Sequence, residues 1–225
     1  MKKTKMSLRT TRSSAEPEQH HGNRYGRSEQ ARQAILEAAD NLLVELGFAA
    51  VTVEGIAAKA GVGKQTIYRW WKSKTDVLLD AFLEDAAQHL NPPDTGSLEA
   101  DLCAHLHQCA QFFEKSDSGA VFRALIGEAQ HDEVLARQLR SKYLNQQRTR
   151  DRLPLVHAIE RGEVRPDVDV DSIIDAVIAP IHYRILVTGQ PVARSFTDNL
   201  AQQVVAQLRD REPMPKLRRL HLPKS

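Results

Sequence analysis

Apolar residues recur at intervals of three and four along most of the chain, which is the spacing of one face of an α-helix. A first stripe runs from Ile35 to Leu46, in a helix that Ser28 can cap, and Thr75 can cap a later helix over 76–90. Later stripes predict helices over 98–114, 171–188 and 196–208, and a long helical segment from Asp132 that kinks or restarts at Pro154. No segment has the two-residue period of a strand, so the pattern predicts an all-α fold.

Composition divides the chain into four parts. Residues 1–27 are rich in Ser, Thr, Lys and Arg and lack a hydrophobic period, so we expect a disordered basic arm that is either a solvated tail or a DNA contact. We expect a DNA-binding unit over 28–88, a larger helical domain over 89–210 and a basic tail over 211–225. The Pro/Gly loop at 91–97 is the predicted boundary.

Residues 52–71 carry the strongest signal for function. Thr52 can cap a helix over about 53–60, Gly61 ends it, and a second short helix follows over 64–71. Two short helices joined by a glycine-centred turn are typical of a helix-turn-helix, whose second helix reads bases in the major groove. The outward residues of that second helix are Lys64, Gln65, Thr66, Tyr68 and Arg69. An amide such as Gln65 can pair with adenine through two hydrogen bonds.

Residues 34–82 (AILEAADNLLVELGFAAVTVEGIAAKAGVGKQTIYRWWKSKTDVLLDAF) resemble the TetR/AcrR family of bacterial transcriptional regulators. The shared parts, in order, are an apolar helix ending in Gly-aromatic, a Thr-hydrophobic helix start, Ile-Ala-x-x-Ala-Gly-Val, Thr-hydrophobic-Tyr and Ser-Lys. The stretch HYRILVTG at 182–189 also resembles the second-last helix of one group of these regulators.

The resemblance implies a role for each matching residue. Thr52 would cap its helix and meet a DNA phosphate, and Tyr68 and Lys74 would also contact the phosphate backbone. Lys64, Gln65 and Thr66 would read bases. The sequence departs from the family at Gly63, where Ser or Ala is usual, and at Trp70-Trp71, where His-Phe is common. Trp71 is expected in the core, and Trp70 either faces DNA or packs on the scaffold.

The distribution of charge agrees with a polyanionic partner. The net charge is only +2, but residues 1–76 carry +5, residues 77–208 carry −7 and residues 209–225 carry +4. A basic head on an acidic body suggests that the head meets nucleic acid.

The resemblance also implies a homodimer and a small-molecule effector. The apolar faces of the helices over 171–188 and 196–208 would pair with a second copy, unless they only close the core of one subunit. The helices over 98–165 would enclose the effector. The polar residues that can serve this pocket are His105, Arg123, His182 and Tyr183.

Other chemistry has little support in the sequence. Cys103 with His107 and His105 with Cys109 have the i, i+4 spacing of metal ligands, but two residues do not make a site, so no metal is predicted. No phosphate loop or nucleophile motif occurs, so we expect no cofactor and no enzyme. No apolar run reaches the roughly 18 residues of a membrane span, and the two cysteines are placed too far apart for a disulfide, which favours the cytoplasm.

The sequence therefore predicts a homodimeric repressor that leaves a palindromic operator in double-stranded DNA when a small molecule binds. The alternatives are an all-α interaction protein that has lost DNA binding, or a regulator of this kind that acts as an activator.

Overall fold

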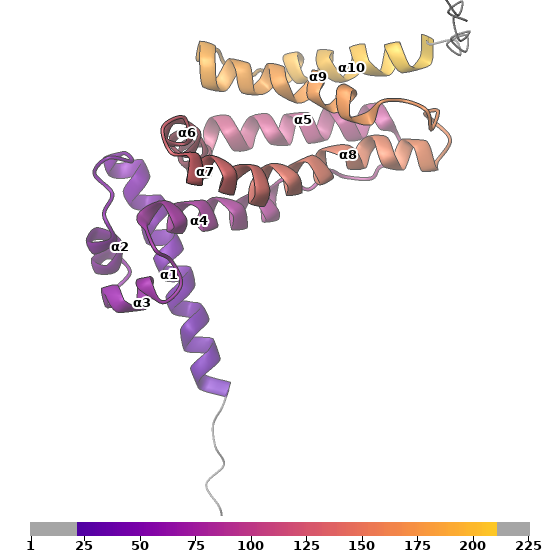
Figure 1. Cartoon of the computed structure of the whole chain (residues 1–225). Coiled ribbons are helices and arrows are strands. Elements are labelled where there is room, and N and C mark those ends of the chain that lie inside the picture. The colour runs from indigo at the N-terminus through magenta and orange to yellow at the C-terminus, as the bar shows by residue number, and fades with distance from the viewer. Residues whose placement is uncertain (1–21, 211–225) are drawn as a thin grey trace, which may run out of the picture.

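The computed structural model describes residues 22–210, and within them helices are joined by turns and loops with no strand, which confirms the all-α prediction (Figure 1). The elements are α1 (Gly22–Leu46), α2 (Val53–Lys59), α3 (Lys64–Tyr68), α4 (Lys74–His89), α5 (Leu98–Lys115), α6 (Asp117–Ala129), α7 (Glu133–Gln138), the π-helical segment η1 (Leu139–Leu144), α8 (Asn145–Glu160), α9 (Val170–Tyr183), the π-helical segment η2 (Arg184–Thr188) and α10 (Arg194–Asp210).

Two predicted helix starts are wrong. Helix α1 begins at Gly22, so Ser28 lies inside the helix, and residues 22–27 do not belong to a disordered arm. The rest of the predicted arm and the basic tail over 211–225 lie outside the described residues. Helix α4 is capped by Ser73 rather than Thr75, because the Ser73 hydroxyl accepts the hydrogen bond of the Asp76 amide at 3.1 Å.

The chain does not restart at Pro154, which was one of the two outcomes predicted there. Helix α8 continues through Pro154, which is buried, and the change of helical geometry comes earlier, in η1. A single proline removes one backbone hydrogen bond, and packing of the buried face can offset that loss. The same occurs at Pro180, since α9 runs past it before η2 begins.

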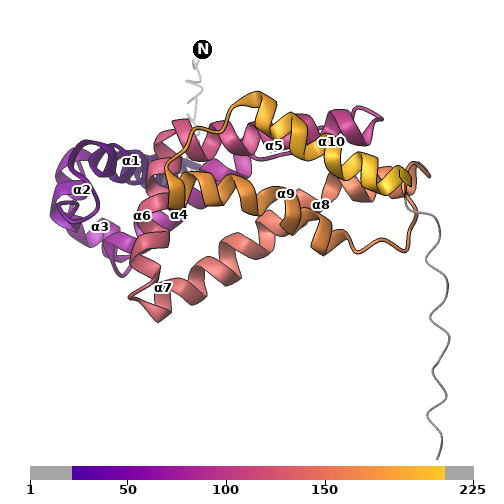
Figure 2. The same ribbon diagram turned by 90° about the horizontal axis from the view of Figure 1, so that it is seen from above.

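The helices form two groups that meet at α4 and α6. Figure 1 shows α1–α3 at one side and α5, α8, α9 and α10 stacked beyond α4, with α10 outermost. The view from above in Figure 2 shows α10 along α5, which it contacts extensively. Helices α1 and α4 both pack on α6, so α6 joins the two groups.

The buried residues form two hydrophobic cores. One core includes α1–α4 and continues into α6, α7 and η1, from Ile35 through Phe82 and Phe122 to Tyr143. The other lies between α5, α8, α9 and α10. The predicted boundary between 28–88 and 89–210 therefore does not separate the cores. A displacement in α6 or η1 would act directly on the packing of α4.

Candidate DNA-binding site

Local interactions fix the geometry between α2 and α3. The Thr52 hydroxyl accepts the hydrogen bond of the Gly55 amide at 3.0 Å, which caps α2. Gly61 has a φ of +67°, a left-handed conformation that side chains rarely adopt. The Val62 amide then donates to the Ala57 carbonyl at 3.0 Å, which closes the turn. These contacts confirm the predicted helix-turn-helix.

Helix α3 is shorter than predicted, and it ends at Tyr68 rather than at residue 71. Ile67 is completely buried and attaches α3 to the core. The side chains of Lys64, Gln65, Tyr68 and Arg69 are exposed, and Thr66 is half-buried. Tyr68 keeps 50% of its surface exposed, which is unusual for an aromatic residue in a packed unit. The predicted DNA-reading residues therefore share one open surface.

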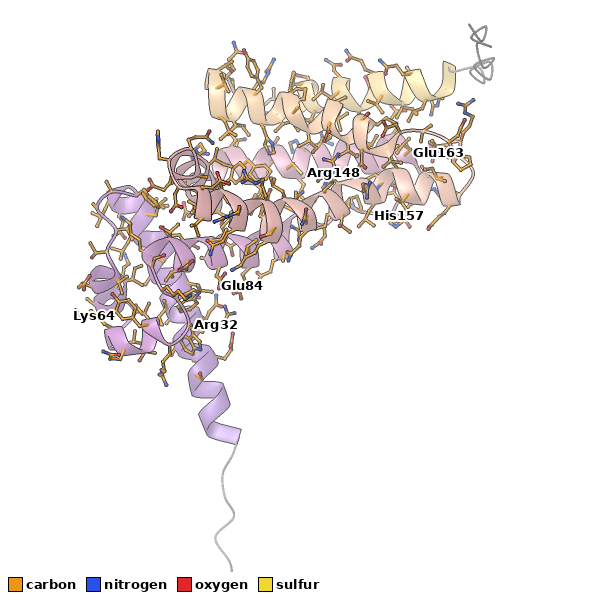
Figure 3. All side chains as sticks on the ribbon, in the orientation of Figure 1. Arg32, Lys64, Glu84, Arg148, His157 and Glu163 are labelled. Atoms are coloured by element: carbon orange, nitrogen blue, oxygen red, sulfur yellow. The ribbon has the colours of Figure 1, made fainter. Side chains whose placement is uncertain are left out.

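An ion pair within this surface holds Lys64. Its Nζ atom lies 3.1 Å from Oε1 of Glu54 on α2, and both side chains are more than half exposed. The hydrogen bond from Lys64 lowers the pKa of Glu54. Figure 3 places Lys64 on the far side of the α1–α3 group from the larger helical group. An exposed pair of this kind is weak, so it holds Lys64 only loosely.

The structure places Lys74 differently from the other predicted DNA contacts. Its Nζ donates to the Phe48 carbonyl at 2.7 Å and lies 4.5 Å from the centre of the Phe48 ring. Lys74 therefore connects the start of α4 to the loop that precedes α2. This interaction positions α2 and leaves the other two ammonium hydrogens available to DNA.

The two tryptophans have different environments. Trp71 is 3% exposed and its Nε1 donates to Asp80 at 2.8 Å, as expected for a core residue. Trp70 is 37% exposed, packs edge-on against Trp71 and lies 5.8 Å from the Arg69 guanidinium. Trp70 thus contacts the scaffold and also borders the DNA-reading surface.

An ion pair fixes this unit to α4. Arg32 on α1 donates to Glu84 on α4 at 2.8 Å, and the two side chains face each other in Figure 3. The surface that carries the predicted DNA contacts is therefore connected through α1 to α4. A short exposed helix after a glycine turn, carried on two packed helices, defines a helix-turn-helix DNA-binding protein.

Comparisons with known proteins extend this conclusion to the whole chain. The family model for "Bacterial regulatory proteins, tetR family" matches residues 35–81, and the model for "Tetracyclin repressor-like, C-terminal domain" matches residues 92–204. The chain is 42% identical over 174 residues to YdeS of Bacillus subtilis (strain 168), an uncharacterized HTH-type transcriptional regulator, and this match covers 77% of the chain and 87% of YdeS. The DNA-binding transcriptional repressor TetR of Mycobacteroides abscessus is 31% identical, with coverage of 80% and 94%.

Solved structures agree with this assignment. The TetR family regulator SCO0332 is 35% identical with a TM-score of 0.69, and the match covers 79% of this chain and 97% of that one. The fold also matches FadR from Bacillus subtilis in complex with stearoyl-CoA, with a TM-score of 0.61, 20% identity and coverage of 78% and 96%. The chain belongs to the TetR family, and it is a DNA-binding transcriptional regulator.

The larger helical group contains a cavity of about 420 Å³ between η1, α8 and α9. Apolar residues such as Ile174 and Ile178 line it together with polar ones. Arg148 lies at this cavity and is bound to Asp175 at 2.9 Å, which joins α8 to α9 (Figure 3). The volume is in the range of small-molecule sites.

The four predicted effector-binding residues have different positions. His182 lines the cavity, and burial lowers the pKa of this imidazole, whose Nε2 has no hydrogen-bond partner within residues 22–210. His105 is 1% exposed and contacts Asp151, a lining residue. Arg123 donates instead to the Phe113 carbonyl at 2.6 Å, and Tyr183 is 59% exposed. The structure therefore places only His182 and His105 at or beside the cavity.

The sequence analysis missed three buried polar residues at the cavity. The Asp151 carboxylate accepts from His105 Nε2 at 2.7 Å and from Gln147 Nε2 at 2.6 Å. Tyr143 is fully buried, and its hydroxyl has no hydrogen-bond partner among the described residues. Burial, followed by the nearby Cys109 and Asp151, raises the pKa of Tyr143 well above its usual value. All three missed residues follow Asp132 in a polar stretch without a motif, so no sequence signal could have identified them.

An aromatic cluster connects the cavity to α4. The rings of Tyr143 and Phe82 have centres 4.7 Å apart, and Phe122 lies 5.3 Å from Phe82 and 5.6 Å from His182. Phe82 belongs to α4, which carries the DNA-binding unit. Of the two cavity residues, Tyr143 therefore packs directly on Phe82 of α4, and His182 is connected to Phe82 through Phe122.

The last two helices use much of their apolar surface within the subunit. Ile174, Val177 and Ile181 of α9 and Val204 and Val205 of α10 are buried in the second core. The two predicted outcomes for these residues were a dimer interface or the core of one subunit, and α5 and α8 cover them within the subunit. Tyr183 at the end of α9 and Val187 in η2 remain exposed, at 59% and 70%. No helix in residues 22–210 is long and apolar enough to cross a bilayer.

Proposed function

We propose that this regulator is a homodimeric repressor that leaves a palindromic operator when a small molecule occupies the cavity. The observation that supports it best is the connection from the cavity through Tyr143 to Phe82 on α4, at a ring distance of 4.7 Å. Such a ligand must bind the DNA-incompetent arrangement more tightly than the DNA-competent one. Because its operator lies on chromosomal DNA, the regulator acts in the bacterial cytoplasm.

In this proposal the exposed residues of α3 make the specific contacts. Gln65 reads a base, Lys64 leaves Glu54 to contact DNA, and Thr66 supports the base contacts. Tyr68 and Arg69 bind phosphates, with Thr52 at the start of α2. Lys74 acts mainly by holding α2 through the Phe48 carbonyl. Trp70 borders this surface.

One helix-turn-helix buries too little surface for specific binding, so two copies are needed. We place the dimer interface on the outer side of α9 and α10, including exposed Tyr183 and Val187. Light scattering checks it: Val187→Glu should convert a dimer to a monomer, and Val134→Glu, at an exposed apolar residue of α7, should not. A dimer with Val187→Glu would place the interface elsewhere.

DNA binding is tested with a site enriched from random duplex DNA. Gln65→Ala should weaken binding to that site by about 5- to 150-fold and leave random-sequence binding nearly unchanged, since a bidentate base contact contributes about 1–3 kcal/mol. Gln88→Ala, at an exposed glutamine of α4, is the matched control. Equal losses on both DNAs would refute the base-reading role of Gln65.

The salt dependence separates the repressor from the alternative all-α interaction protein. A DNA reader loses affinity steeply as salt rises, and Lys64→Ala should reduce that slope by about one. A protein that has lost DNA binding would not select any preferred sequence from random duplex DNA. A reporter gene placed behind the enriched site decides between repression and activation.

Effector control is tested at the cavity. His182→Ala should leave operator binding intact but change the response to compounds that release the wild type, because His182 lines the cavity and has no hydrogen-bond partner in the described residues. His107→Ala, on α5 outside the lining residues, is the control. An unchanged response in His182→Ala would exclude this cavity as the effector site.

A further inference from the structure

Helix α5 carries two His–Cys pairs with the same spacing, and the tertiary structure completes only one of them. Asp198 contacts Cys103, but no third ligand atom gathers with both Cys103 and His107 within 4.8 Å among the described residues. His105 and Cys109 lie next to Asp151, which α8 contributes from 46 residues further along the chain. The donor atoms of these three residues all lie within 4.8 Å of one another, and all three residues are buried.

We propose that His105 Nε2, Cys109 Sγ and Asp151 form a binding site for a divalent ion of the zinc class. An imidazole nitrogen, a thiolate and a carboxylate are the three kinds of ligand that zinc takes from proteins. Three protein ligands leave one tetrahedral position open, as in sites where zinc also binds water or an exogenous ligand. This inference does not depend on the proposed repressor mechanism.

Two of the three distances between ligand atoms fit a tetrahedral ion after a small adjustment. Nitrogen and sulfur ligands of one zinc ion lie about 3.5 Å apart, given usual bond lengths near 2.0 and 2.3 Å. His105 Nε2 and Cys109 Sγ are 3.7 Å apart. His105 Nε2 and Asp151 Oδ1 are 2.7 Å apart, and this distance must widen to about 3.3 Å when an ion replaces their shared hydrogen. Ion binding releases the thiol proton of Cys109 to solvent. His105 binds the ion through Nε2 as a neutral imidazole, and its ring proton then sits on Nδ1.

The surroundings supply an outer shell and an access route. Gln147 donates to the Asp151 carboxylate at 2.6 Å, which orients it as outer residues orient metal ligands. The cavity is lined by Asp151 and Tyr143, so an ion can reach the cluster from that side. The buried Tyr143 hydroxyl lacks a hydrogen-bond partner in residues 22–210, which makes it available to a ligand in the open position. The Nδ1 atom of His105 is also unpartnered there, so we expect weaker binding than at a closed four-ligand site.

Cobalt(II) titration of the full chain tests the site, in buffer with a phosphine reductant and without added thiols. Co²⁺ bound to a thiolate gives a charge-transfer band in the near ultraviolet, and a tetrahedral site gives strong visible bands. We expect both bands to saturate at about one ion per chain. Zn²⁺ should then displace Co²⁺ and remove the bands.

Single-residue variants identify which cysteine supplies the thiolate ligand. Cys109→Ser should abolish the charge-transfer band, and the matched control Cys103→Ser should keep it, because Cys103 lies outside the cluster. Asp151→Asn should weaken cobalt binding at least tenfold, and it serves as the second variant if Cys109→Ser does not fold. Absence of the band in the wild type, or its loss in Cys103→Ser instead, would overturn the proposal and leave a buried hydrogen-bond network.

Discussion

Asp40 provides the most quantitative test of the structure, since its carboxyl group is half-buried where α1 meets α4 and α6. Its Oδ1 atom is buried without a hydrogen-bond partner among the described residues. Burial, and then the charges of Asp85 and Asp117, raise the pKa of Asp40 from 3.8 to about 7. We predict that Asp40→Asn stabilises the protein, and that the gain grows with pH.

The size of the effect follows from this difference in pKa. Between about pH 4 and pH 7 the folded protein retains a proton that the unfolded chain has lost, so stability falls as pH rises, and the penalty is complete above pH 7. Each pKa unit corresponds to about 1.4 kcal/mol, which gives an upper limit of about 4 kcal/mol. Solvent at this partly exposed site reduces that figure, so we expect Asp40→Asn to gain about 1–3 kcal/mol more at pH 8 than at pH 5.

Urea unfolding at pH 5 and pH 8 measures the two free energies of unfolding, and thermal melts should show a larger increase in melting temperature at pH 8. Glu37→Gln is the matched control, because Glu37 lines the same surface pocket but is exposed. Its effect should be small at both pH values. An equal effect of Asp40→Asn at pH 5 and pH 8, or the same pH dependence in Glu37→Gln, would refute the reasoning.

Three further predictions concern stability, each measured by chemical denaturation. Gly119→Ala should cost about 1–3 kcal/mol because its new Cβ would lie 2.6 Å from the Phe112 carbonyl oxygen, whereas Gly127→Ala in the same helix meets nothing within 4 Å and should be neutral or stabilising. Thr52→Ala should cost about 0.5–2 kcal/mol through the lost cap, and no loss would contradict the observed bond to Gly55. Trp71→Phe should cost about 1–3 kcal/mol, since it leaves the Asp80 carboxylate without its indole partner.

The DNA-binding unit was largely predictable because local chemistry determines it. Thr52 caps the helix that directly follows it, and Gly61 takes a backbone conformation that favours glycine. Ile67 is the buried residue among the exposed ones of its short helix. These effects act within a few residues, so they are visible in sequence. The errors at Ser28 and Pro154 arose where tertiary packing outweighed a local signal, by extending α1 or by holding α8 together.

The cavity and the candidate metal site could not be predicted in the same way. Their residues come from α5, η1, α8 and α9, and Asp151 has no sequence pattern that relates it to His105. The sequence also offered two equivalent His–Cys pairs on α5, and only the position of α8 distinguishes them.

The sequence by itself therefore determined the helical fold, the helix-turn-helix and its exposed reading residues, because periodicity, capping and turn chemistry are local. The tertiary structure alone decided which side chains meet across helices. In the folded protein Tyr143 packs on Phe82, and Asp151 forms a hydrogen bond with His105. Arg123 donates to a backbone carbonyl, and Tyr183 lies at the surface. The physical reason is that contacts between distant helices depend on how whole apolar faces pack, and that packing is a property of the complete core.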